Sequence, residues 1–509
     1  MSIMRIDVYS HNVVISQFTR EVRDTIANYM SSYVEYDVSK NHRGDIIRKA
    51  VRVYGGATFD RSEYRIHRSA LDEFLNHLSN FGYPKTSIDI TYHPLPFIEP
   101  IEVNLLENVK PRPAQIPLIE HLIKPIPSKL AVLQMGGGKT FSLLYAISVL
   151  KQRFVIVLKP MYIDRWVKAL TDPKERILDI EKKDILTVQG TKELKRLIDY
   201  AKADALSAKI IIISNRTLYG MYEHYERTGD LTFYGIHPND FYPLLKANRA
   251  IDELHQEFHF NFRQDMYTHT GTCIGLSGTM TSDTPFINRM YRYMFPKDAW
   301  YEDTNYNRYT NVISLYYNLR NEQDIKYIRR GRASYSHIDF EKSVMKSKTT
   351  CKNYIDMMLA TIDEYYIREY QEGQRCIVFA GMVDMCQLIV TRLRERYPHL
   401  TINKYTSGDP YSNLLTSDIS VSTIGSAGTA VDIPDLMLCL STTAISKSET
   451  NLQVMGRLRE NKRWPNKHPV FAYFVCEDIP KHVSYHTKKV KLLKPYVLGQ
   501  KTIFTDIRI

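Results

Sequence analysis

The chain has 509 residues, of which 44% are hydrophobic and 24% charged, the composition of an ordinary globular protein long enough for about three domains. No run of about eighteen apolar residues occurs, and the first residues lack the layout of a signal peptide, so we expect neither a membrane span nor secretion. The net charge of +12 favours an anionic partner, nucleic acid first, although a mildly basic enzyme would have the same charge. The six cysteines form no CxxC pair, which predicts no zinc or redox motif and fits a reducing cytoplasm.

Residues 1–102 predict a small α+β accessory domain. Within it, residues 69–84 predict a helix, because a serine can cap its start, leucine and phenylalanine recur at helical spacing, and a glycine and a proline follow. The pair Gly55-Gly56 predicts the turn of a β-hairpin. The proline-spaced residues 93–100 predict a linker to the next domain.

Residues 103–295 predict a domain built on a doubly wound parallel sheet. Short apolar runs that end in small or polar residues alternate there with helical segments, as in sheets of this kind. The predicted strands cover residues 129–135, 153–160, 209–214, 249–252 and 272–279.

The same alternation returns over residues 349–509, which predict a second parallel-sheet domain with a basic C-terminal tail. Its predicted strands cover residues 375–381, 401–405, 419–424, 437–442 and 470–475. Between the two domains, residues 296–348 are rich in tyrosine and arginine without a clean period, and they predict a basic aromatic insertion or linker.

The stretch LQMGGGKTFSLLY, residues 133–145, predicts a phosphate-binding loop. Gly136, Gly137 and Gly138 lie between a predicted strand and a predicted helix, so that backbone N–H groups and a helix N-terminus can face an anion. Lys139 would contact the β- and γ-phosphates of ATP, and the hydroxyl of Thr140 would bind Mg²⁺. The alternative is a glycine-rich turn without a ligand, because Leu133 stands where the full pattern has its first glycine.

Asp252 and Glu253 follow a predicted strand, at the edge of a parallel sheet where ligands bind. Asp252 is expected to hold Mg²⁺ through water, and Glu253 to act as the general base for hydrolysis. An acidic pair exposed in a loop is the alternative interpretation.

The segment LQVMGRLRE of the second sheet domain contains Gln453, Arg457 and Arg459. An arginine finger must stabilise the charge that develops on the γ-phosphate, and we expect Arg457 to supply it with Arg459 assisting. A basic helix face without a catalytic role is the alternative. Finger and phosphate loop would meet only when the two domains close, which would couple hydrolysis to motion.

The order of these segments resembles that of superfamily 2 helicases and translocases over residues 112–460. In chain order, RPAQ looks like a Q motif, MGGGKT like motif I, VLKPMYIDRW like motif Ia, IIISNRTL like a strand-contacting motif, DELH like motif II, LSGTM like motif III, RCIVFAGMVDMC like motif IV, VSTIGSAGTAVDIPD like motif V and QVMGRLRE like motif VI. Motif VI departs from the family pattern, since Glu460 takes the place of its last arginine.

The resemblance implies two RecA-like domains in tandem and a nucleotide site that uses further residues. Arg112 and Gln115 would read adenine, Asp432 would approach the ribose or the domain interface, and Gln453 would belong to the site through motif VI.

The resemblance also implies that both sheet domains bind the backbone of one nucleic-acid strand, with salt-dependent affinity. The motif positions predicted to contact it are Lys159, Pro160, Arg165, Asn215, Thr217, Thr423 and Gly425. In the insertion, Arg329, Arg330 and Arg332 are expected to contact nucleic acid, whereas its tyrosines are as easily explained by ordinary packing.

The N-terminal residues are similar to the accessory domain of UvsW-type phage helicases, which implies DNA binding and the remodelling of branched DNA by fork regression or branch migration. The sequence thus predicts an ATP- and Mg²⁺-dependent DNA helicase, monomeric, in the cytoplasm of a bacterial host. An RNA helicase, a translocase on double-stranded DNA that does not separate strands, and a degenerate ATPase that serves as a scaffold are the alternatives.

Overall fold

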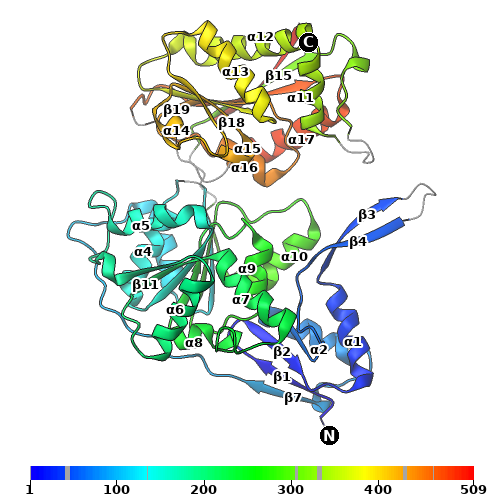
Figure 1. Ribbon diagram of the computed structural model, residues 1–509, viewed down its shortest axis with the longest axis vertical. Coiled ribbons are helices and arrows are strands. Elements are labelled where there is room, and N and C mark those ends of the chain that lie inside the picture. Colours follow the sequence, from blue (N-terminus) through cyan, green and yellow to red (C-terminus); the bar gives the residue numbers. More distant parts are fainter. Residues whose placement is uncertain are drawn as a thin grey trace. The chain divides into compact units, whose positions relative to one another are not determined.

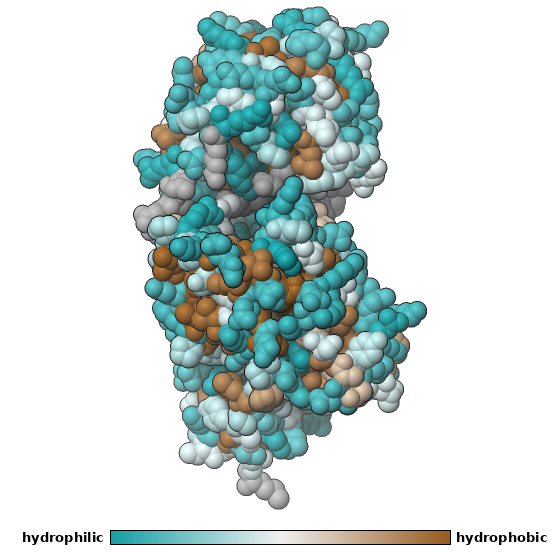
Figure 2. Space-filling model, turned by 90° about the vertical axis from the view of Figure 1, so that its left-hand side faces the viewer, coloured by the Kyte–Doolittle hydropathy of each residue, from teal (hydrophilic) through white to brown (hydrophobic). Residues whose placement is uncertain are grey.

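The computed structural model describes residues 2–40, 46–134, 136–303, 308–328, 335–427, 433–461 and 463–509. The chain forms two compact units, drawn in Figure 1. The first consists of Met1–Leu133 and Gly137–Asp303, and the second of Gln134–Gly136 and Thr304–Ile509. Among the described residues no helix is both long and apolar enough to cross a bilayer. The face in Figure 2 is mainly hydrophilic, with an apolar area on the first unit.

The first unit begins with a five-stranded mixed sheet in the order β5-β6-β2-β1-β7. Its strands are β1 Met4–Val8, β2 Asn12–Ser16, β5 Gly56–Ala57, β6 Glu63–His67 and β7 Ile88–Tyr92. The helices α1, Arg20–Ser31, and α2, Leu71–Asn80, pack against it. The predicted helix is thereby confirmed, and its apolar positions Leu71, Phe74, Leu75 and Leu78 are buried.

The serine cap predicted for this helix is wrong. Helix α2 begins at Leu71 after the 3₁₀ turn Arg68–Ala70, and no side chain caps its N-terminus. The hydroxyl of Ser69 instead donates to the carbonyl of Tyr293 in the neighbouring layer. A tertiary hydrogen bond has replaced the local one that sequence reasoning assumes.

The hairpin predicted around Gly55-Gly56 is also wrong. Strand β3, Val34–Lys40, pairs with β4, Ile46–Val53, in a separate two-stranded sheet, and β5 pairs with β6 across a turn at residues 58–62. The two glycines serve close packing, because an added Cβ would lie 2.5 Å from Met30 Cε at Gly55 and 2.9 Å from Arg65 Cβ at Gly56.

The first unit continues with a seven-stranded, fully parallel sheet in the order β10-β11-β9-β12-β13-β8-β14. Its strands are β8 Ser128–Val132, β9 Phe154–Leu158, β10 Ile185–Val188, β11 Ile210–Ser214, β12 Asn248–Ile251, β13 Cys273–Ser277 and β14 Trp300–Glu302. Its helices are α3 Ile116–Ile123, α4 Lys139–Leu150, α5 Ile163–Thr171, α6 Thr191–Lys202, α7 Asn215–Thr228, α8 Phe241–Leu245, α9 Phe258–Asp265 and α10 Pro285–Met294. The five strands predicted here are confirmed.

The N-terminal sheet and this parallel sheet share one core. A single hydrophobic cluster contains Ile6 and Phe74 as well as Val155 and Ile213. The predicted linker follows the surface of the same unit, where the N–H of Glu99 donates to the Lys246 carbonyl at 2.8 Å. The accessory layer is therefore built into the first unit.

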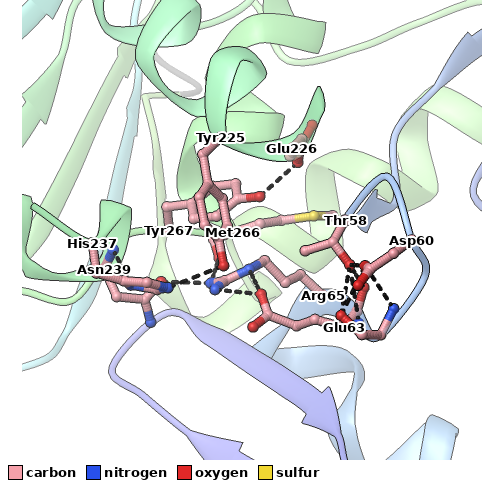
Figure 3. A network of polar contacts seen from close by, with 11 residues as sticks. Thr58, Asp60, Glu63, Arg65, Tyr225, Glu226, His237, Asn239, Met266 and Tyr267 are labelled. Carbon is pink, nitrogen blue, oxygen red and sulfur yellow. Dashed lines mark hydrogen bonds and ion pairs between the residues drawn. The ribbon is translucent and has the colours of Figure 1, made fainter. Parts of the chain in front are cut away.

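Arg65 of β6 stands at the centre of the polar contacts between these two layers (Figure 3). It is 1% exposed, forms an ion pair of 2.6 Å with Glu63 and donates to Asn239 Oδ1 and to the carbonyl of Met266. Its guanidinium lies 4.1 Å from the centre of the Tyr267 ring. This buried cation thus ties β6 to the loops beneath the parallel sheet.

The second unit is another seven-stranded parallel sheet, in the order β17-β18-β16-β19-β20-β15-β21. Its strands are β15 Asn311–Asn318, β16 Arg375–Ala380, β17 Ile402–Tyr405, β18 Ile419–Thr423, β19 Leu436–Ser441, β20 Val470–Cys476 and β21 Gly499–Arg508. Its helices are α11 His337–Lys346, α12 Lys348–Tyr365, α13 Val383–Arg396, α14 Ser412–Thr416, α15 Ile424–Ala427, α16 Ser448–Met455 and α17 Pro480–Leu493.

Both faces of this second sheet are covered. In β16, Val378 and Ala380 belong to one hydrophobic cluster, and Ile377 and Phe379 belong to another. Successive residues of a strand point to opposite faces, so each face packs against its own apolar layer. The chain therefore contains two RecA-like α/β domains in tandem, as predicted, and an N-terminal mixed sheet.

The segment predicted as an insertion, residues 296–348, contributes one strand to each of the two parallel sheets. Strand β14 pairs with β8 in the first unit, and β15 lies between β20 and β21 in the second. Tyr316 and Tyr317 of β15 are buried, which favours the packing interpretation of these tyrosines. The predicted basic tail is helix α17 followed by the edge strand β21. The sequence did not predict β14, β15 and β21, because each is defined by hydrogen bonds to a strand that is distant in the chain.

Candidate nucleotide site

The predicted phosphate loop follows β8 and leads into α4. Gly136 and Gly138 have φ values of +82° and +88°, a region in which glycine is favoured, and α4 begins at Lys139 directly after Gly138. Lys139 is buried and Thr140, in the first helical turn, is half-buried. Strand, glycine turn and helix N-terminus thus stand in the order that an anion site requires.

Leu133 occupies the position where the full pattern has glycine, and the structure explains why leucine is tolerated. Its side chain is 3% exposed, so it belongs to the core. Its N–H donates to the Ser277 carbonyl at 3.0 Å, and its own carbonyl accepts from Lys139 Nζ at 3.4 Å. Position 133 thus continues the sheet, and its backbone carbonyl contacts the lysine of the loop.

The predicted Q motif lies against this loop. The N–H of Arg112 donates to Gln115 Oε1 at 2.9 Å, which holds the buried amide of Gln115 in place, while Arg112 itself is exposed. A Cβ added to Gly138 would overlap the amide of Gln115. Gly138 is therefore required twice, by its φ and by the close approach of Gln115.

Strand β12 ends directly before the acidic pair. In the sheet, Ile251 pairs with Val157 of β9 and with Gly275 of β13, so the chain leaves all three strands at the same edge. The N–H of Asp252 continues the ladder by donating to the Val157 carbonyl at 3.0 Å. Glu253 then adopts a φ of +48°, an uncommon conformation for a residue with a side chain.

Glu253 and Asp252 meet the lysine of the loop. Glu253 Oε1 lies 3.6 Å from Lys139 Nζ. Asp252 accepts the Glu253 N–H at Oδ1, 2.9 Å, and the indole N–H of Trp166 at Oδ2, 2.8 Å. Burial, followed by the charge of Glu253, raises the pKa of Asp252 to about 6. A divalent cation bound here would stabilise the ionised form of these two adjacent, partly desolvated carboxylates.

The histidine of DELH connects the acidic pair to β13. His255 Nδ1 lies 2.7 Å from Ser277 Oγ and 3.5 Å from Glu253 Oε2. The Ser277 hydroxyl also contacts the backbone of Thr279. The segments that resemble motifs II and III are therefore in direct contact.

Residues 252–257, here called the acidic segment, also contact the segments that follow β9 and β11. Tyr162 OH donates to Gln256 Oε1 at 2.9 Å. Glu257 accepts from Asn215 Nδ2 at 2.8 Å and from the guanidinium of Arg216. Burial acts to raise the pKa of Glu257, but these hydrogen bonds outweigh it and hold the pKa below its ordinary value.

The residues of the first unit that we expected to contact nucleic acid differ in exposure. Arg165 is exposed, and Lys159 and Pro160 are half-buried. Asn215 is 1% exposed, and its amide donates to Glu257. The Thr217 hydroxyl accepts the N–H of Gly190 at 2.8 Å.

In the second unit, Arg457 is 1% exposed, whereas Arg459 is half-buried and donates to the Gly456 carbonyl. Within helix α16, the amide of Gln453 donates to Glu449 Oε1 at 3.2 Å.

Thr423 ends strand β18, and its hydroxyl lies 2.9 Å from Ser426 Oγ. Gly425 is exposed, and an added Cβ there would meet no atom within 4 Å. The predictions for Asp432, Arg329, Arg330 and Arg332 fall outside the described residues.

Sequence reasoning assigned no individual role to Trp166, Tyr162, His255 or Ser277, although all four lie inside segments that it identified. A buried tryptophan or tyrosine on a helix is ordinarily a core residue, and only the register of β9 against β12 brings these side chains to the acidic segment. The one available signal was their position, at or a few residues beyond the ends of predicted strands.

No family model and no curated protein matches the sequence. Similar solved structures include T4 UvsW, with 11% identity, a TM-score of 0.33 and all of both chains covered. The Hef helicase domain of Pyrococcus furiosus has 11% identity and a TM-score of 0.44 over 74% of this chain and 98% of that one. S. cerevisiae Dbp5 bound to RNA and ADP BeF3 has 12% identity and a TM-score of 0.49 over 78% and 90%. The two seven-stranded parallel sheets form the tandem RecA-like fold that the order of the motifs predicts.

Proposed function

We propose that this protein is an ATP-dependent DNA helicase or translocase that unwinds or remodels branched DNA. One observation carries the proposal: at the carboxyl edge of a parallel sheet, Lys139 lies 3.6 Å from Glu253, next to the half-buried Asp252. The same acidic segment is hydrogen-bonded to the segments that follow β9, β11 and β13. A structural change during hydrolysis at this edge would therefore be transmitted to several segments through these hydrogen bonds.

Each residue of the first unit has a role in the proposed reaction. The glycine loop and Lys139 would hold the phosphates of ATP, and in the nucleotide-bound state Lys139 would exchange Glu253 for phosphate oxygen. Glu253 would orient the attacking water and accept its proton. Thr140 and Asp252 would hold Mg²⁺, directly and through water, and the ion would neutralise charge on the phosphates. Gln115 would read the adenine together with Arg112.

The second unit would complete the site. Arg457, with Arg459 assisting, would stabilise the charge of the transition state, and Gln453 would contact the nucleotide, as the resemblance implies. Both arginines would act only in the closed state of the cycle. Thr423 and Gly425 would bind the backbone of the nucleic-acid strand.

The choice of DNA rests on the N-terminal sequence, which resembles that of the accessory domain of UvsW-type phage helicases, and on the charge of +12. Under the same proposal, the protein would act in the cytoplasm of a bacterial host. An RNA helicase and a translocase that leaves the strands paired share the nucleotide site, and they would differ in the polymer that stimulates hydrolysis.

A panel of nucleic acids tests the proposal. ATP hydrolysis and strand separation would be measured with single strands, forks, four-way junctions and RNA duplexes, at two salt concentrations. We expect DNA to stimulate hydrolysis, forks or junctions to be remodelled, and Lys139→Ala to abolish both activities. Lys151→Ala, at the far end of α4, is the matched control and should retain them.

The outcomes separate the alternatives. Stimulation by RNA alone would identify an RNA helicase, and displacement of a triplex strand without duplex separation would identify a double-strand translocase. Absence of any stimulated hydrolysis by the intact protein would refute the proposal. Glu253→Gln is expected to retain ATP binding and lose turnover, and undiminished turnover would refute the assignment of the base.

A further inference from the structure

Helix α5 and the 3₁₀ turn before it, Pro160–Tyr162, have two distinct faces. Trp166 is 2% exposed and points to the acidic segment, where its indole N–H donates to Asp252 Oδ2 at 2.8 Å. On the other face, Met161, Arg165 and Lys168 are exposed to solvent. One short helix therefore joins a surface cation to a carboxylate of the nucleotide site.

A second hydrogen bond fixes the register of this contact. Tyr162, four residues before Trp166, donates to Gln256, four residues after Asp252, at 2.9 Å. The two donors lie one helical turn apart on the same face. Because two bonds join the helix to the acidic segment, a rotation or shift of α5 must be transmitted to that segment.

Both oxygens of Asp252 are oriented by hydrogen bonds. Oδ1 accepts the N–H of Glu253 at 2.9 Å, which is set by the backbone, and Oδ2 accepts the indole N–H of Trp166. Of these two donors, only the indole belongs to an element that also reaches the surface. The direction of the remaining lone pairs, which a Mg²⁺-bound water would use, therefore depends on where α5 lies.

We propose that Trp166 is a positioning residue that couples nucleic-acid binding on the exposed face of α5 to the orientation of Asp252. The inference rests on the proposed function, since it assumes that this site hydrolyses ATP and that α5 binds a nucleic-acid backbone. Arg165 would receive the phosphate, α5 would settle against the acidic segment, and the indole N–H would hold the carboxylate in the direction that Mg²⁺ needs.

The test removes the indole N–H and keeps an aromatic ring. Trp166→Phe is compared with Trp300→Phe, which loses a matched bond, because Trp300 Nε1 donates to the Phe295 carbonyl at 2.8 Å in another part of the first unit. We would measure hydrolysis without and with single-stranded DNA, the KM for ATP, and the Mg²⁺ concentration for half-maximal rate.

We expect Trp166→Phe to lower stimulation by DNA about tenfold and to raise the half-maximal Mg²⁺ concentration by a similar factor, the size of effect that a lost hydrogen bond to a charged group produces. The KM for ATP should change little, and Trp300→Phe should behave like the wild type. If both variants keep the wild-type stimulation and Mg²⁺ dependence, the inference is overturned.

A fluorescence measurement keeps the inference testable if Trp166→Phe folds poorly. The sequence has three tryptophans, so Trp300→Phe/Trp464→Phe leaves Trp166 as the single emitter. DNA added without nucleotide should shift its emission, and Arg165→Ala should remove the shift. Unchanged emission while DNA stimulates hydrolysis would overturn the coupling and leave the proposed function standing. No stimulation in the wild type would refute the proposed function itself, and the inference with it.

Discussion

Arg65→Met should weaken the attachment of the N-terminal sheet to the first parallel sheet. Arg65 is buried, pairs with Glu63 at 2.6 Å and covers the ring of Tyr267 at 4.1 Å. Removing one partner of a buried ion pair costs about 3–5 kcal/mol, because the other charge is left uncompensated. We expect the lower half of this range, since the side chain of Glu63 is 18% exposed and keeps part of its hydration.

The assay has to report on the N-terminal sheet alone, because a chain of several domains does not unfold in one step. Native-state hydrogen exchange of the amides of β2 and β6 gives the free energy of opening of this layer. Arg52→Met is the matched control, since Arg52 lies 3.6 Å from Glu35 and is exposed, and such surface pairs contribute below about 1 kcal/mol.

A double variant sharpens the test. Arg65→Met/Glu63→Gln removes the stranded charge and should recover about 1–2 kcal/mol of the loss, as expected for coupled neighbours. An effect of Arg65→Met no larger than that of Arg52→Met would refute the reasoning, because the energetic role of Arg65 would then be that of a surface arginine.

Three further variants test the loop and the second core. Gly138→Ala should lose ATP binding, because φ is +88° and the added Cβ overlaps Gln115, whereas Gly220→Ala, with open space around it, should bind a fluorescent ATP analogue normally. Leu133→Gly completes the loop pattern, yet it should destabilise the protein by about 2–5 kcal/mol in urea without raising turnover, because the side chain is buried. Burial lowers the pKa of Lys489 to about 7, so the unfolded chain binds more protons than the folded chain between about pH 7 and 10, and the free energy of unfolding should rise with pH across this window. Lys489→Met should remove about 2–4 kcal/mol of that rise. If the urea midpoint of the variant equals that of the wild type at both pH 7 and pH 9, this prediction is contradicted.

The sequence by itself predicted the elements whose signal is local. The continuous β-branched run at residues 210–213 is typical of a buried strand, and the GGGKT turn between a strand and a helix is typical of a phosphate-binding loop. Such patterns predicted the tandem parallel sheets and the position of the acidic pair after its strand. They also predicted the segments that contact the acidic pair. Strands β14, β15 and β21 were not predicted, because each is stabilised by pairing with a strand that is distant in the chain.

The tertiary structure decided how the identified segments meet. In the folded chain, Asn215 is buried and donates to Glu257. Ser69 donates to the carbonyl of Tyr293 and does not cap a helix. Gly55 and Gly56 lie in tight packing and do not form the predicted turn. The tertiary structure also brought Trp166 to Asp252, since the parallel register of β9 and β12 sets both chain ends at one edge of the sheet. Local propensity fixes where a strand ends, whereas the residue that faces that end depends on strand order, which only long-range pairing decides.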